Sequence, residues 1–416
     1  MSTRRRVVIT GLGTVNPLGL GARETWRALC AGKSGVRHLT RFDCHRMRTQ
    51  VGGEVRDFTA SDFLSDKMAR RTDRFQQFAL AAAQMAIDDS GLSVTPAIGE
   101  RTGVIIGTAF GGIASALAGQ DQYRNGGREE ISPFLVPMML PGMAAGQVAM
   151  RFHARGPNSS PTTACAAGTH AISDGCRLIR QGAADVMLVG GAEAALMPPL
   201  YQCFGVMGAT TGRKKDPEKA SRPFDGERDG FVPSEGAGML VIEALEFAIR
   251  REARIYAEII GFAATADAYH VTSPAPGGEG AARCMRLALQ DAGLSPGDID
   301  YINAHGTSTK LNDSTETEAI KAVFGERALS IPVSSNKSML GHTMGASGAI
   351  EAAYSVLSIL DGIIPPTVNH ETPDPDCDLD YVPNKARNAR INTVLSNSFG
   401  FGGVNGVLVF KSFANP

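Results

Sequence analysis

One cysteine stands among unusually small neighbours. Cys165 lies in TTACAAGTH (residues 162–170), where threonine, alanine and glycine surround the thiol and leave its sulfur accessible. Apolar positions after it recur at helical spacing, so Cys165 is expected at or just before a helix N-terminus. The free amides and the dipole of such a helix stabilise a thiolate, and we expect the pKa of this thiol to lie below its usual value of about 8.5. The alternative is a small cysteine that only packs, the default for this residue type.

Two histidines lie in glycine-rich loops that follow strand-like runs. His305 belongs to YINAHGTST, and His342 belongs to SSNKSMLGHTMGASG, five residues after Lys337. Because α/β proteins assemble their sites at strand ends, both imidazoles can converge on Cys165. A thiol beside two imidazoles suits acyl transfer and the stabilisation of an enolate oxygen. Each histidine taken alone is more often a hydrogen-bonded loop residue.

Short β-branched runs alternate with helical patterns along the chain. Strands are expected at residues 7–13, 102–112, 184–193, 238–245, 255–267, 300–309, 331–337 and 394–403, and helices at 75–89, 169–182, 281–293 and 345–360. This alternation predicts an α/β fold in which helices cover the sheets. No Pro- or Ser-rich linker divides the chain. We expect two similar halves, residues 1–253 with the nucleophile and residues 254–416 with the histidines.

The composition excludes several classes of protein. The chain has 416 residues, 43% of them apolar, and a formal net charge of −1, which argues against a general nucleic-acid binder. No run approaches 18 uninterrupted apolar residues, so no membrane span is expected. The seven scattered cysteines form neither a CxxC pair nor a metal-like cluster with histidine, and they predict reduced thiols in a cytoplasmic protein.

Several motifs together resemble the β-ketoacyl-[acyl-carrier-protein] synthases, the type I/II condensing enzymes, and most closely synthase II. They are TACAAG, NAHGTST, KSMLGHTMGASGAIE, NSFGFGGVNG and ASRPFDGERDGFVPSEGAGMLVIE, and with VVITGLGTVNPLG they span nearly the whole chain. The resemblance implies the thiolase fold, a duplicated αβαβα five-layered sandwich that usually forms a homodimer. It also implies an acyltransferase without a redox cofactor. Such an enzyme joins an acyl group to malonyl-acyl carrier protein by decarboxylative Claisen condensation, in fatty-acid or specialised lipid or polyketide biosynthesis.

The same resemblance assigns roles to individual residues. Cys165 takes the acyl group as a thioester. His305 and His342 hydrogen-bond the thioester carbonyl of the malonyl substrate and ease the loss of CO2. The backbone amides of Cys165 and Phe401 form the oxyanion hole, a task suited to donors aimed at developing negative charge.

A charged pair and two asparagines match further features of the family. Lys337 and Glu351 lie beside the histidines, where the lysine keeps an imidazole neutral; a purely structural salt bridge explains them equally well. Asn303 and Asn397, with Glu351, fall near a monovalent-cation site of some members, which implies a structural Na⁺ or K⁺.

Three phenylalanines match the acyl pocket and its gate. Phe399 and Phe401 lie in NSFGFGG, whose glycines allow a loop to swing. Phe110 occupies a tunnel-lining position where long-chain members commonly carry isoleucine or a smaller residue. Because packed pockets tolerate little added volume, we expect a preference for short or unusual acyl groups.

The surface for the carrier protein is mixed in charge. Four basic residues recur at the spacing of one helix face and would suit an acidic carrier, or form an ordinary solvated face: Lys67, Arg70, Arg71 and Arg74. Against this, Glu129 and Glu130 stand where a basic pair is common, and Gly208 replaces an expected arginine, although the basic segment 212–219 offers compensation. We therefore expect a dedicated carrier protein or altered docking.

Two other functions are possible for a chain that resembles this family. A chain-length factor, a non-catalytic partner subunit of a polyketide synthase, resembles this family but lacks the nucleophile, whereas this chain has Cys165 and both histidines. A thiolase acting on coenzyme A thioesters pairs its nucleophile with a second cysteine instead of a second histidine, which the motif GHTMG does not fit.

Overall fold

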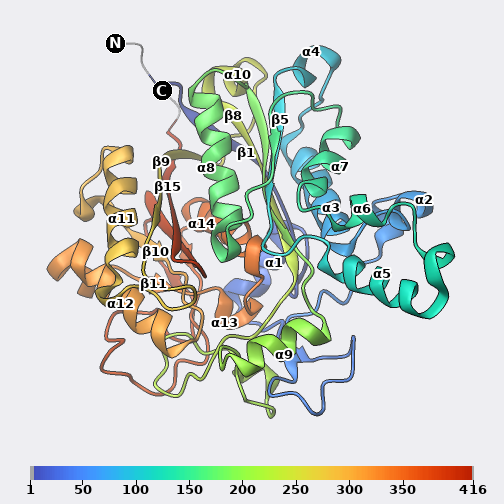
Figure 1. Ribbon diagram of the computed structural model, residues 1–416. Coiled ribbons are helices and arrows are strands. Elements are labelled where there is room, and N and C mark those ends of the chain that lie inside the picture. The colour runs from blue at the N-terminus through green and yellow to red at the C-terminus, as the bar shows by residue number, and fades with distance from the viewer. Residues whose placement is uncertain (1–3, 415–416) are drawn as a thin grey trace.

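The computed structural model describes residues 4–414 (Figure 1). Its core is an eleven-stranded sheet whose main strands lie in the order β11-β10-β14-β15-β9-β1-β8-β7-β5-β6. The strands of the first half are β1 (Val7–Asn16), β5 (Thr102–Gly107), β6 (Asn158–Ser159), β7 (Val186–Glu193) and β8 (Gly236–Ala244). Those of the second half are β9 (Ala257–Ala266), β10 (Tyr301–Asn303), β11 (Val333–Ser334), β14 (Thr393–Gly400) and β15 (Val404–Ser412).

The two halves of the sheet repeat one topology. Numbered along each half, the strands lie in the order 3-2-4-5-1 in both. The 3-2 and 2-4 pairings are parallel, and the 4-5 and 5-1 pairings are antiparallel, again in both. The halves meet through two residue pairs of β1 and β9. The division expected after residue 253 falls in the connection between α10 (Leu245–Arg250) and β9.

Helices form the remaining layers. The middle helices α8 (Ala167–Arg180) and α14 (Ser347–Asp361) lie between the two half-sheets, and Figure 1 shows α8 running between β8 and β15. On the outer faces, α3 (Arg74–Ser90) covers β1 and β8, while α11 (Glu279–Ala292) covers β9 and β15. The expected duplicated five-layered α/β sandwich is confirmed. Further helices surround it: α5 (Ile113–Gly126), α6 (Leu135–Met139), α7 (Met143–Arg151), α9 (Pro198–Val206) and α12 (Lys310–Phe324).

Glycines in the strands allow the outer helices to pack closely against the sheet. A Cβ added at Gly13 in β1 would lie 2.0 Å from the carbonyl oxygen of Ala82 in α3. The second half repeats this contact, because a Cβ at Gly261 in β9 would lie 2.5 Å from the carbonyl oxygen of Ala288 in α11. Glycine on the strand and alanine on the helix thus set the distance between the layers.

Candidate active site

Cys165 lies in the turn that leads into a middle helix. The turn is a short 3-10 helix, Ala164–Ala166, which continues directly into α8. The preceding residue, Ala164, has φ +48°, a left-handed conformation that is costly for a non-glycine residue and is typically retained at functional sites. The thiol is half-buried at the helix N-terminus, where the spacing of the apolar residues places it.

His342 comes from the equivalent turn of the second half and reaches the sulfur. Its Nε2 lies 3.0 Å from Cys165 Sγ. The backbone N–H of Met344 donates to His342 Nδ1 over 3.3 Å, so Nδ1 is an acceptor and the ring proton belongs on Nε2. Met344 has φ +48°, as Ala164 has, and the turn Met344–Ala346 continues into α14 just as the Cys165 turn continues into α8.

His305 completes the triad after β10. Its ring centroid lies 5.4 Å from that of His342, with the ring planes at 83°. The carboxylate of Glu316 in α12 accepts hydrogen bonds from the backbone amides of His305 and Gly306, each over 2.8 Å, and so fixes the loop. Burial and the nearby charge of Lys337 hold the pKa of both histidines well below 6.5, and the imidazoles are therefore neutral.

The expectation of a depressed thiol pKa is wrong for the resting site. Burial raises the pKa of Cys165 to about 12, although the charge of Lys337 and the amides of Phe401 and Cys165 act in the opposite direction. Desolvation of the anion thus outweighs the helix N-terminus here. The sulfur therefore rests as a thiol.

The predicted charged pair is formed and fully buried. Lys337, the first residue of α13 (Lys337–Leu340), donates to Glu351 in α14, and each side chain is only 2% exposed. Burial raises the pKa of Glu351 to about 7, against the opposing effect of Lys337. Its ammonium group, Lys337, adds a buried positive charge that acts in the same direction as burial and lowers the pKa of both histidines.

A cavity of about 480 Å³ opens onto the triad. Its lining includes Cys165, His305, His342, Phe399 and Phe401, together with the threonines that follow His305, Thr307 and Thr309. Phe401 lies at the turn between β14 and β15 and is 38% exposed, so its ring stands at the mouth. Gly402 has φ +85° and donates its N–H to the carbonyl of Val271, while the carbonyl of Gly403 accepts from the N–H of Asp267, so two backbone hydrogen bonds hold the turn to residues 267–271.

A cluster of aromatic rings packs near the sulfur. Phe110, half-buried in the loop after β5, packs with Cys165, Phe204 and Met344. The rings of Phe110 and Phe204 lie 6.2 Å apart, edge to face, and Phe204 contacts Phe231 in the same way at 5.3 Å. Phe110 thus packs against the same apolar cluster as the nucleophile and is not among the residues that line the open cavity.

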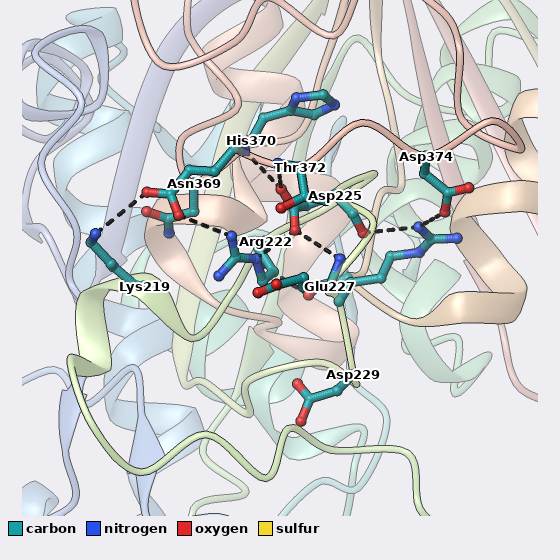
Figure 2. Close-up of polar contacts among 12 residues, drawn as sticks. Lys219, Arg222, Asp225, Glu227, Asp229, Asn369, His370, Thr372 and Asp374 are labelled. Carbon is teal, nitrogen blue, oxygen red and sulfur yellow. Dashed lines mark hydrogen bonds and ion pairs between the residues drawn. The ribbon is translucent and has the colours of Figure 1, made fainter.

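The loop that carries Phe231 is held by a polar network (Figure 2). Asp225 accepts from Arg222 over 2.8 Å and from the backbone of Thr372 over 2.6 Å, which fastens the loop to residues 369–374. Beyond it, the N–H of Gly230 donates to the carbonyl of Ser308, in the segment that follows His305. The sequence motif containing SRPFDGERDG pointed to this loop, but not to its supporting role.

The predicted docking helix is not continuous. α2 (Asp66–Ala69) ends before Arg70, and α3 begins at Arg74 after an Asp73 cap, so the four basic residues do not share one helix face. Arg74 is also not available for docking, because it forms a two-pronged ion pair with buried Glu235 and lies over the Phe78 ring. Lys67, Arg70 and Arg71 remain exposed.

Family profiles match almost the whole chain. The profile "Beta-ketoacyl synthase, N-terminal domain" matches residues 4–248, and "Beta-ketoacyl synthase, C-terminal domain" matches residues 256–371. Within residues 4–414, no helix has the length and apolarity needed to cross a bilayer.

Curated relatives and solved structures agree with these profiles. The chain is 50% identical to 3-oxoacyl-[acyl-carrier-protein] synthase 2 of Coxiella burnetii, over 98% of this chain and 99% of that protein. It is 48% identical to the synthase 2 of Synechocystis sp., over 99% of each chain. A type II polyketide ketosynthase, solved in complex with its acyl-carrier protein, superposes with a TM-score of 0.92 at 39% identity, over 99% of this chain and 100% of that one. The chain belongs to the β-ketoacyl synthase family.

Proposed function

We propose that this protein elongates acyl chains on an acyl carrier protein by decarboxylative Claisen condensation, in fatty-acid or specialised lipid biosynthesis. The observation that carries the proposal is the 3.0 Å approach of His342 Nε2 to Cys165 Sγ, with a second neutral imidazole, His305, in the same cavity. The products are a 3-oxoacyl-carrier thioester, CO2 and free carrier thiol.

The first half-reaction moves the acyl group to Cys165. The sulfur attacks the carbonyl of the acyl-carrier thioester, and its proton leaves with the departing carrier thiol. The Nε2–H of His342 and the amides of Cys165 and Phe401 face the sulfur and stabilise its developing charge. Because the thiol pKa is raised, the anion exists only while the thioester is in place.

The second half-reaction uses both histidines as donors. The malonyl thioester loses CO2, and the electron pair of the broken C–C bond becomes an enolate whose oxygen is bound by His305 and His342. The enolate carbon then attacks the acyl-Cys165 carbonyl. The tetrahedral oxyanion is held by the amides of Cys165 and Phe401, and it collapses with release of the thiolate, which takes a proton from water. Neutral imidazoles suit this step because each can donate a hydrogen bond to the enolate oxygen without transferring its proton.

The acyl chain accepted on Cys165 is short or unusual in shape. Phe110 packs against Phe204 beside the sulfur, where a long chain would have to displace two rings. Overfilling a packed wall of this kind costs about 1–3 kcal/mol.

A structural Na⁺ or K⁺ fits the oxygens near the charged pair. Among residues 4–414, four buried side-chain oxygens lack a hydrogen-bond partner, the Ser358 hydroxyl and three amide or carboxylate oxygens: Asn336 Oδ1, Asn397 Oδ1 and Glu351 Oε2. Hard cations prefer such carboxylate and amide oxygens. Asn303 would act indirectly, because its own oxygen already accepts from Asn336. Such an ion would offset the negative charge of Glu351, and a higher Tm in NaCl or KCl than in choline chloride would support it.

The protein acts on its carrier as a cytoplasmic homodimer. Exposed apolar side chains on α5, on α6 and at the residue that follows α6 offer a surface for a second copy: Tyr123, Val136, Met139 and Leu140. Exposed Lys67, Arg70 and Arg71 offer a basic surface to an acidic carrier protein. The acidic Glu129 and Glu130 limit docking to a dedicated carrier protein. All seven cysteines are unpaired, as in a reducing compartment.

A non-catalytic chain-length factor is the rejected alternative. Such a subunit needs no nucleophile, whereas here the thiol and both imidazoles line one cavity, and the buried Lys337 lies close enough for its charge to act on both imidazoles. The solved ishigamide ketosynthase/chain length factor, 40% identical with a TM-score of 0.92, shows that this fold accompanies both roles, so the residues of the site decide between them.

Intact-mass analysis of the purified protein tests the function. Incubation with acyl-carrier thioesters of increasing length should add one acyl mass to the wild type and none to Cys165→Ser. Subsequent malonyl-carrier should remove that mass and yield 3-oxoacyl-carrier. Cys203→Ser, which changes an exposed cysteine, is the matched control and should load normally. Condensation by Cys165→Ser at the wild-type rate would contradict the proposal.

A further inference from the structure

A buried carboxylate that takes no part in these steps lies between the two sides of the site. Glu193 is the last residue of β7 and is fully buried. Its Oε2 accepts from the backbone N–H of Ala109 over 2.6 Å and from that of Gly345 over 3.1 Å. Its Oε1 accepts from Thr108 Oγ1 over 3.1 Å and from the N–H of Phe110 over 3.3 Å.

These bonds join two segments that are far apart in the sequence. One, residues 108–110, carries the phenyl ring beside Cys165; the other, residues 342–346, carries His342. The segments already touch, since a Cβ added at Gly345 would lie 2.5 Å from the amide nitrogen of Ala109. At this distance no water fits between them, and the amides would stay unpaired without the carboxylate.

The link continues to the reacting sulfur. Gly345, held by Glu193, follows Met344, whose backbone has φ +48° and needs support to remain left-handed. The N–H of Met344 keeps His342 Nδ1 as an acceptor, which leaves the proton on Nε2, 3.0 Å from Cys165 Sγ. Glu193 therefore holds both the Phe110 segment and the Met344 turn, which sets the tautomer of His342.

We propose that Glu193 is a positioning residue of the condensation site, whose carboxylate clamps the Phe110 segment to the His342 segment. This inference rests on the proposed function and deepens it. The clamp fixes His342, which donates a hydrogen bond to the enolate oxygen. It also makes the position of His342 depend on how the acyl chain packs against the Phe110 segment. Burial raises the pKa of Glu193 to about 7, so the carboxyl is negatively charged at pH 8, and there its charge disfavours the Cys165 thiolate, against the positive charge of Lys337 and beside the neutral His305 and His342.

Two substitutions separate the clamp from the charge. Glu193→Gln preserves the shape, because its carbonyl can accept from Ala109 and Gly345 while its NH2 donates to Thr108 Oγ1. It removes the charge and one long hydrogen bond, that from the Phe110 N–H over 3.3 Å, and it keeps the two bonds that join the segments. We expect condensation within about threefold of wild type and Cys165 alkylation by iodoacetamide about threefold or more faster at pH 8. Glu193→Ala removes the clamp, and we expect kcat to fall about 10–100-fold with KM for malonyl-carrier little changed.

A matched control distinguishes positioning from stability. Glu243→Ala removes another fully buried carboxylate, one that binds Thr10 and Arg251 away from the cavity. Both alanine variants should lower Tm, but only Glu193→Ala should lower kcat per folded protein and broaden the range of acyl chains loaded.

The outcomes separate this inference from the proposed function. A wild type that does not condense would remove the proposed function itself. A wild type that condenses, with equal kcat for Glu193→Ala and Glu243→Ala, would overturn the clamp alone. Unchanged alkylation in Glu193→Gln would overturn the charge effect.

Discussion

At the level of single residues, the site combines a neutral thiol with two neutral imidazoles. This is the reverse of a thiolate–imidazolium pair, and it follows from burial. Lys337 supplies the positive charge that an imidazolium would otherwise carry, and Glu351 keeps that lysine inside the protein. The histidines are free to act as hydrogen-bond donors throughout the cycle.

The first prediction concerns pH. Because the pKa of His305 and of His342 lies well below 6.5, both stay neutral as the pH falls through that value. The rate of malonyl-carrier decarboxylation should therefore show no loss from protonation of either imidazole between pH 7.5 and 6. Stopped-flow measurement of CO2 release across this range checks it, with substrate and carrier stability verified separately. Because burial raises the pKa of Glu193 and of Glu351 to about 7, Glu193→Gln and Glu351→Gln are the controls. A halving of the rate near pH 6.5 that persists in both variants would show that an ordinary histidine controls the step.

The second prediction concerns the acyl wall. Phe110→Ala removes a ring from the cluster with Phe204 and opens space beside Cys165. Loading of carrier thioesters longer than those accepted by the wild type should increase about tenfold or more relative to short ones, a change on the scale of a few methylene groups. Competition between two chain lengths, read by intact mass, measures the ratio. Phe58→Ala, a change in a distant aromatic cluster, should leave the ratio unaltered.

At the level of elements, two equivalent turns meet at the N-termini of α8 and α14. Their approach depends on small residues, since a Cβ at Gly348 in α14 would lie 2.0 Å from Thr169 Oγ1 in α8. The sequence pattern predicted both helices and the turns before them. It could not show that the turns are equivalent, because their sequences, TACAAG and HTMGAS, share little beyond small side chains.

Other elements escaped prediction for physical reasons. β15 was missed because the glycine-rich run after Phe399 reads as one strand with a loop, whereas the chain turns at residues 401–403 and returns. α12 was missed because its polar outer face hides the apolar stripe of Ala319, Ile320 and Phe324. Arg74 was misassigned because spacing alone does not reveal the break at Asp73 or the buried partner Glu235. Glu193 had no local signal, since its partners are backbone amides from two other segments.

The third prediction tests the contact between α3 and β1. Gly13→Ala places a methyl group 2.0 Å from the carbonyl oxygen of Ala82, so helix and strand must separate. The free energy of unfolding should fall by about 1–3 kcal/mol. Urea unfolding followed by circular dichroism measures the loss. Gly142→Ala is the matched control, because φ there is −68° and its added Cβ meets nothing within 4 Å; equal losses in both variants would refute the packing argument.

At the level of the whole molecule, the exposed apolar faces of α5 and α6 lead to the fourth prediction. Size-exclusion chromatography with multi-angle light scattering should give a molar mass twice the chain mass of 43.8 kDa. Leu140→Asp, at a side chain that is 47% exposed, should shift the population toward the single chain by adding a charge to the buried contact. Leu329→Asp, a comparably exposed leucine on the other half, should not. A wild type that runs as a single chain would exclude the dimer.

The shared strand order of the two halves has a consequence for how the reaction could be assembled at all. Each half contributes an incomplete set: the first carries the sulfur, and the second carries both imidazoles and the buried ammonium group. A polypeptide ending near residue 250 would have the nucleophile but no imidazoles to bind an enolate. The rest of the chain alone could bind an enolate but would have no acyl-cysteine for it to attack. The complete set of reacting groups exists only where the two halves meet, so condensation requires both halves of the duplicated fold.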